Sequence, residues 1–245
     1  MAAAVKGLTS VVNVLETYRG RDRVMRFLTY AAMFLGGDGR TPLQIKWKIL
    51  SSELSGCRVI LRLFDDLSML LYNMSISFGR KEKGLLKPLE ICTAFFNQLY
   101  YPSEHIAWFR QKKILNGNSA PFSLLGLLFW ALALLGEIAK CLVRLMRLNA
   151  QAKSLQKQRK LDRDSSHETS PQNIQIQENL KKLTAEKMDC ILLFLQYSCD
   201  FINAISWMPP GVLWAQKLKS STNGILGMIA SFIMLYRNWP SSQNS

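Results

Sequence analysis

The chain has 245 residues, 49% of them hydrophobic, and its 31 lysines and arginines exceed its 17 aspartates and glutamates by 14. A chain that is both basic and apolar is typical of proteins that contact anionic lipid headgroups and hydrocarbon. Basic nucleic-acid binders usually lack the apolar share, and the sequence carries no nucleic-acid motif, so we predict no nucleic-acid partner.

The sequence offers little for chemistry. Its five cysteines are odd in number, widely spaced and without a CxxC pair, which indicates a reducing compartment rather than a disulfide framework or a metal site. The segment MAAAVKGLTS lacks the pattern of a secretory signal. No HExxH, GxSxG, GxGxxG or P-loop motif occurs. We therefore expect a protein that is not an enzyme and has no cofactor.

Residues 1–113 are predicted to be an amphipathic helical region on a membrane surface. Within it, residues 5–35 predict a helix that bends at YRGRDR (18–23). Its arginines recur at i, i+4 and i+7 and form a cationic edge that we expect to bind headgroups: Arg19, Arg23 and Arg26. The alternative is a solvent-exposed bend whose arginines make internal ion pairs, such as Asp22 with Arg26.

The strongest local signal begins at Thr41. Thr41, Pro42 and Gln44 have the spacing of a capping box with proline at the first helical position. Apolar residues then recur at steps of four and three as far as Met74, which predicts one amphipathic helix. The predicted membrane-inserting residues are Leu54, Leu61, Phe64, Leu67 and Leu71, and the predicted headgroup-binding residues are Lys46, Lys48, Arg58 and Arg62. A core helix of a bundle is an equally good interpretation of the same pattern.

The carboxy-terminal half predicts two membrane spans. Residues 114–136 carry no charge and are long enough to cross a bilayer, so a first transmembrane helix is placed at 114–143. The second is placed at 220–237, where 17 uncharged residues precede Arg237, and a tail follows at 238–245. A basic helix and a disordered polar linker fill 144–187, with the linker centred on 161–177. Amphipathic and interfacial helices are expected at 188–219. The fold class is thus all-α: an integral membrane helical protein with about two transmembrane helices.

Four stretches in order resemble one family: ETYRGRDRVMRFL (16–28), LSGCRVILRLFDDLSML (54–70), QLYYPSEHIAW (98–108) and WMPPGVLWA (207–215). They are similar to the peroxisomal membrane protein 11 (peroxin-11) family, closest to its gamma branch. The resemblance implies a multi-pass peroxisomal membrane protein with cytosolic termini that promotes peroxisome elongation, proliferation and fission. It also implies insertion of an amphipathic helix into anionic lipids, for which Pro42 to Met74 corresponds to the family's amphipathic region.

The implied partners are further copies of the chain and sister family members, fission adaptors with a dynamin-like GTPase, and the import receptor for peroxisomal membrane proteins. The basic helix is a candidate docking site for that receptor, although it also resembles the ordinary cationic flank of a membrane span: Arg144, Arg147, Lys153 and Lys157. The positive-inside rule would keep this basic segment in the cytosol, contrary to the implied topology.

Two rival functions remain open. One is a metabolite pore, in which the polar stripe Gln196, Asp200 and Asn203 would line a path between assembled protomers. The other is a scaffold that recruits fission machinery without bending the membrane itself.

Overall fold

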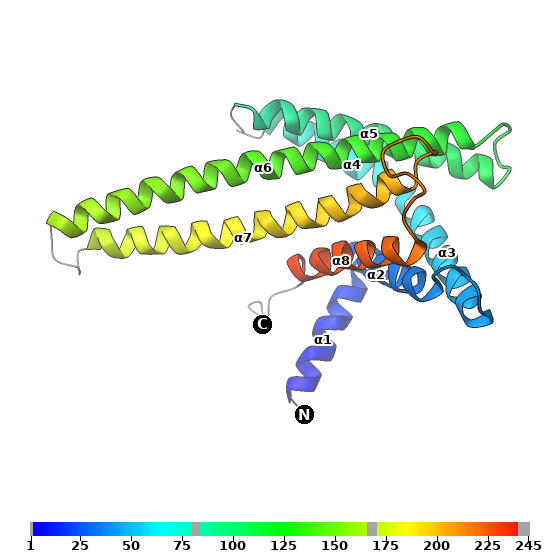
Figure 1. Cartoon of the computed structure of the whole chain (residues 1–245), viewed down its shortest axis with the longest axis horizontal. Helices are drawn as coiled ribbons and strands as arrows, with labels where there is room; N and C mark the ends of the chain where they lie inside the picture. The colour runs from blue at the N-terminus through cyan, green and yellow to red at the C-terminus, as the bar shows by residue number, and fades with distance from the viewer. Residues whose placement is uncertain (1, 80–83, 166–170, 240–245) are drawn as a thin grey trace.

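The computed structural model describes residues 2–79, 84–165 and 171–239, which form eight α-helices and no strand, confirming the all-α prediction (Figure 1). In chain order the helices are α1 (Ala2–Glu16), α2 (Tyr18–Gly36), α3 (Pro42–Arg62), α4 (Asp65–Gly79), α5 (Leu86–Gln111), α6 (Ala120–Ser165), α7 (Pro171–Ser206) and α8 (Ser220–Arg237).

The helices form two groups that meet near the carboxyl end of α7. In the first group, α6 and α7 run side by side as a long antiparallel pair, α5 packs along α6, and α4 packs along α5 (Figure 1). In the second group, α2 lies between α3 and α8, and α8 in turn packs against α7. Within the described residues α1 contacts only α2, and it projects away from both groups.

Side-chain caps fix where α2 and α3 begin. The Thr41 hydroxyl accepts a hydrogen bond from the Gln44 N–H at 3.2 Å, and the Gln44 side chain accepts one from the Thr41 N–H at 3.2 Å, so the predicted capping box is confirmed. Thr17 caps α2 by accepting from the Gly20 N–H at 3.1 Å. The bend therefore precedes YRGRDR. Gly20 is required beside this elbow, because a Cβ there would lie 1.9 Å from the Val14 carbonyl oxygen.

The helix predicted from Pro42 to Met74 is interrupted in the structure. It ends at Arg62, and a tight turn at Leu63 and Phe64 leads into α4 at Asp65. Asp65 and Asp66 occupy the first turn of α4, where carboxylates stabilise the positive end of the helix dipole. The apolar periodicity continues through the turn, which is why the pattern alone predicts a single helix.

Two segments have the length and hydropathy of a membrane span within the described residues. The most apolar stretch of 18 residues within Ala120–Lys160 has mean hydropathy 2.0, and only 22% of that stretch is buried by the rest of the protein. It overlaps the span expected at 114–143. The second segment is Ile174–Ser206, which lies in α7 and not at 220–237. Its most apolar stretch of 18 residues has mean hydropathy 1.3. In α8 the polar residues Asn223 and Ser231 interrupt the apolar sequence, and both are buried against the protein.

The linker prediction is wrong for most of its length. Helix α6 continues to Ser165 and α7 begins at Pro171, so helix occupies most of 161–177. Residues 166–170 lie outside the described residues. Lysine, arginine, glutamine and leucine are good helix formers, and these residue types predominate at the end of α6, which explains why it continues. The part of the predicted tail beyond Trp239 also lies outside the described residues.

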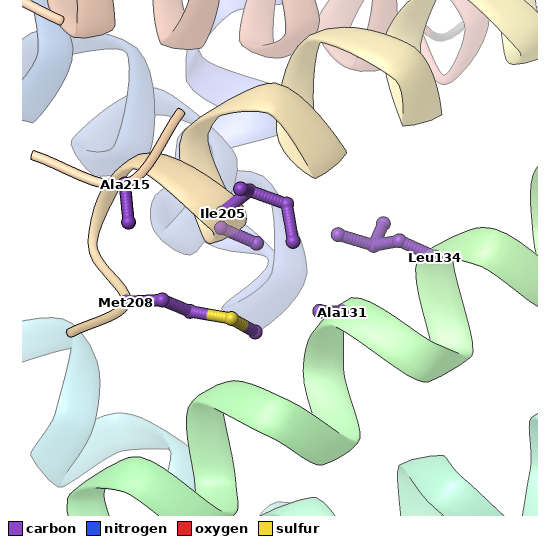
Figure 2. Close-up of a cluster of buried hydrophobic side chains, with 6 residues drawn as sticks. Ala131, Leu134, Ile205, Met208 and Ala215 are labelled. Carbon is purple, nitrogen blue, oxygen red and sulfur yellow. The ribbon is translucent and has the colours of Figure 1, made fainter. Parts of the chain in front are cut away.

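The apolar core is small and sits where α6 meets the end of α7. Ala131 and Leu134 of α6 face Ile205 at the end of α7, and Met208 and Ala215 close the cluster from the following connection (Figure 2). By contrast, leucines along α6 are exposed at 40–50%: Leu124, Leu125, Leu128 and Leu135. A protein that leaves this much large apolar surface uncovered is expected to contact lipid or partner helices.

Candidate membrane-contact surface

Helix α4 turns its polar side toward the protein and its apolar side outward. The Asp66 carboxylate lies 2.9 Å from Nδ1 of His105 of α5. One heptad later, Asn73 donates to Gln98 of α5 at 2.8 Å. These contacts attach the polar face of α4 to α5. The opposite face is left open. Its Leu67 at 78% and Leu71 at 73% are among the most exposed side chains of the described residues, as is Phe64 at 78% in the turn that precedes α4.

This orientation is the reverse of that found in water-soluble bundles, where an amphipathic helix buries its apolar stripe. The two remaining predicted inserting residues, Leu54 and Leu61, belong to α3 and are half-buried. The structure therefore brings Phe64, Leu67 and Leu71 together on one exposed face, and it separates Leu54 and Leu61 from them.

Three of the predicted headgroup-binding arginines form internal ion pairs. Arg62 donates Nε and Nη2 to the Glu104 carboxylate, with the Nε contact at 2.9 Å. Arg58 donates Nε to Asp22 at 2.8 Å, so Asp22 does not pair with Arg26 as its spacing suggests.

The third arginine, Arg26, is buried and pairs with Asp200 of α7. Of the three arginines predicted at the bend, only Arg26 agrees with the alternative interpretation of internal ion pairs, because Arg19 and Arg23 form none within the described residues. The three ion pairs also oppose a headgroup role for Arg26, Arg58 and Arg62 in this conformation.

The other predicted headgroup residues are more accessible. Arg19, Lys46 and Lys48 are exposed, and Arg23 is half-buried. Lys46 and Lys48 belong to α3 and Arg19 belongs to α2, so the exposed cations lie on the same two neighbouring helices. They can attract an anionic membrane surface without first breaking an ion pair.

The basic residues proposed for receptor docking lie along α6. Arg147, Lys153 and Lys157 are exposed and Arg144 is half-buried. Arg144 and Arg147 also line a cavity of about 610 Å³ between α6 and α7, which contains the carboxylates of Glu186 and Asp189. The cavity thus brings two basic residues of α6 near two acidic residues of α7.

The polar stripe considered for a pore faces the interior of the chain. Gln196, Asp200 and Asn203 are exposed at no more than 4%. Asp200 pairs with Arg26, and the Asn203 amide donates to the Asn223 carbonyl at 3.1 Å. In this conformation the stripe connects α7 to α2 and α8 and does not line an open path.

Sequence reasoning missed the contacts that orient α4. Asp66 and Asn73 are seven residues apart, so they lie on the same face of the helix, opposite the leucines. That spacing was the only local sign that this polar face could pack against another helix. Their partners on α5 are 25 or more residues away along the chain, and no local pattern identifies them.

Comparison with known proteins places this chain in a family. The family model for peroxisomal biogenesis factor 11 (PEX11) matches residues 8–239. Peroxisomal membrane protein 11C of Homo sapiens is 31% identical over 238 residues, covering 94% of this chain and 93% of the relative. Its counterpart from Mus musculus is 31% identical over 235 residues and covers 92% of each. No solved structure matches. The chain belongs to the peroxisomal biogenesis factor 11 family.

Proposed function

We propose that this protein is a multi-pass protein of the peroxisomal membrane that promotes peroxisome elongation and fission, with α4 as the element that bends the bilayer. Membership of the family and the names of the human and mouse relatives support the organelle and the membrane. The observation that carries the mechanism is the orientation of α4, whose polar residues face α5 while Phe64, Leu67 and Leu71 face outward.

Insertion of this face adds area to one leaflet only. An interfacial helix buries its apolar side about 5–10 Å into the boundary between headgroups and acyl chains, which favours positive curvature. Each buried leucine or phenylalanine contributes about 1.5–3 kcal/mol, and each lysine or arginine near an anionic surface contributes about 1 kcal/mol. Apolar insertion therefore outweighs electrostatic attraction, and self-association of the chain would multiply the effect into a tubule.

Liposome tubulation tests this mechanism on the full chain. We expect Phe64→Glu combined with Leu67→Glu to abolish tubulation of anionic liposomes, because two carboxylates would have to enter the apolar layer. A matched control places the same two charges at exposed polar positions, Asn13→Glu with Ser52→Glu, and should retain tubulation. Equal tubulation by the wild type and the Phe64 and Leu67 variant would contradict the assignment.

The scaffold alternative is separated by the same assay. A chain that only recruits fission adaptors and a dynamin-like GTPase would leave protein-free liposomes unchanged while still binding its partners.

The exposed cations at Arg147, Lys153 and Lys157 support docking of the membrane-protein import receptor. Correct peroxisomal targeting after all three are changed to glutamine would refute that role.

Cytosolic termini are part of the same proposal. The antiparallel arrangement of α6 and α7 supports a shared side for the two termini, because two crossings return the chain to its starting side (Figure 1). The cationic residues of α6 stand against cytosolic termini under the positive-inside rule. Protease protection of tags at each end, in intact peroxisomes, decides between the two orientations.

A further inference from the structure

A cavity of about 390 Å³ lies beside the α1–α2 elbow, where α2 and the carboxyl end of α3 meet α4. Its lining includes Arg19 and Arg23 of α2, Ser68 and Met69 of α4, and Tyr101 of α5. Ser68 and Met69 lie between Leu67 and Leu71 in the sequence of α4. The cavity is therefore adjacent to the helix that carries the exposed apolar face.

The two arginines of α2 are one helical turn apart, and within the described residues neither forms an ion pair or donates a side-chain hydrogen bond. Two other charged residues of the lining form ion pairs with residues outside it: Asp22 pairs with Arg58, and Arg62 pairs with Glu104. Asp65 also lines the cavity, and within the described residues it forms no ion pair with Arg19 or Arg23. Burial, with the like charge of Arg19, lowers the pKa of the Arg23 guanidinium.

Two hydroxyl groups complete a set of donors. Neither Ser68 nor Tyr101 donates a hydrogen bond to another described group, and both line the cavity. Burial raises the pKa of Tyr101 to about 12, so its hydroxyl keeps its proton at neutral pH. Two guanidiniums and two hydroxyls place hydrogen-bond donors around one cavity, and they outnumber its acidic residues, Asp22 and Asp65.

We propose that this cavity binds the phosphomonoester group of an anionic lipid, with Arg19 and Arg23 holding the phosphate. A phosphomonoester carries about −1.5 to −2 charges at pH 7 and three acceptor oxygens, which suits two adjacent guanidiniums better than a singly charged phosphodiester does. The inference rests on the proposed function, because α4 must lie at the headgroup level for a membrane lipid to reach the cavity. The same chemistry would also accept a soluble phosphate ester.

Calorimetric titration of the full chain in phosphatidylcholine nanodiscs tests the site with three probes: dihexanoyl phosphatidic acid, dihexanoyl phosphatidylglycerol and glycerol 3-phosphate. We expect phosphatidic acid to bind most tightly. Arg19→Gln and Arg23→Gln should each weaken it about tenfold, because each removes a charge-assisted hydrogen bond. Arg21→Gln is the matched control, since Arg21 has the same charge in the same turn but lies outside the lining.

A second pair of variants tests the cavity itself without changing charge. Ser68→Trp fills the cavity and should abolish binding of phosphatidic acid, whereas Ser75→Trp, at an exposed serine of α4 outside the lining, should not. Glycerol 3-phosphate binding as tightly as phosphatidic acid would assign the site to a soluble phosphate ester. Equal affinity for phosphatidic acid and phosphatidylglycerol, unaffected by Arg19→Gln, Arg23→Gln and Ser68→Trp, would overturn the proposal.

The two proposals fail separately. Tubulation of phosphatidylglycerol liposomes depends on insertion of α4 and needs no phosphomonoester, so it is measured on the wild-type chain. A wild-type chain that tubulates these liposomes but binds phosphatidic acid no more tightly than phosphatidylglycerol therefore refutes the site alone. Failure of the Phe64 and Leu67 variant to reduce tubulation refutes the insertion mechanism, whatever the titrations show.

Discussion

Arg26 of α2 and Asp200 of α7 form a buried ion pair between residues 174 positions apart in the chain. The Arg26 guanidinium also lies over the ring of Tyr30, 5.7 Å from its centroid, and Tyr30 stacks on Trp207 at the end of α7. The pair therefore joins the amino-terminal amphipathic helices to a candidate membrane span.

Breaking the pair from one side should destabilise the protein strongly. Asp200→Leu leaves the Arg26 charge buried without a partner, and we expect a loss of about 3–5 kcal/mol in the free energy of unfolding. Thermal unfolding in detergent measures it. The double variant Arg26→Leu with Asp200→Leu should recover most of the loss, because no charge is then left buried.

The matched control is the exposed pair between Asp189 and Arg237, in which the Asp189 side chain is 51% exposed. Asp189→Leu should cost no more than about 1 kcal/mol, as is usual for ion pairs at the surface. Similar losses for Asp189→Leu and Asp200→Leu would show that burial does not set the strength of these pairs.

Sequence reasoning succeeded where the interactions are local. The capping box at Thr41 and Gln44 depends on residues three apart, and the helical class follows from periodicity within each segment. It failed where the partner is distant. Asp22 has Arg26 four residues away, yet it pairs with Arg58 of another helix. The turn at Leu63 contains neither glycine nor proline, and only the docking of α4 on α5 explains it.

The close approach of α2 and α8 should be sensitive to a single methyl group. A Cβ at Gly227 would lie 2.1 Å from the Tyr30 ring, so Gly227→Ala forces the two helices apart. We expect a loss of about 1–3 kcal/mol in the free energy of unfolding, the usual cost of overpacking. Gly56→Ala is the control, because a Cβ there meets nothing within 4 Å. An unchanged unfolding temperature for Gly227→Ala would disprove the tight contact.

Salt should weaken membrane binding without abolishing it. Lys46 and Lys48 are exposed on α3, and each should contribute about 1 kcal/mol at an anionic surface. We expect Lys46→Gln with Lys48→Gln to reduce liposome co-flotation at low salt and to make binding less dependent on salt. At high salt the variant and the wild type should bind alike, because screening removes the electrostatic part. A variant as salt-dependent as the wild type would exclude these lysines from headgroup contact.

The connection between α7 and α8 reports which helix is the second membrane span. If α6 and α7 both cross the bilayer, residues 207–219 lie on the same side as α1. If α8 crosses in place of α7, they lie on the opposite side, although both termini share one side in either case. Val212, which is 39% exposed, is a suitable position for a reporter cysteine after the exposed Cys57 and Cys92 are changed to serine.

We expect a membrane-impermeant maleimide to label Val212→Cys and a reference cysteine at Val5 from the same side of intact peroxisomes. A cysteine at Lys157, near the far end of α6, should be labelled only after the membrane is opened. The reason is that α7 has the hydropathy of a span, whereas the apolar sequence of α8 is interrupted by the buried Asn223 and Ser231. Protection of Val212→Cys together with Lys157→Cys would assign the second crossing to α8, and the pairing of α6 with α7 would then lie outside the bilayer.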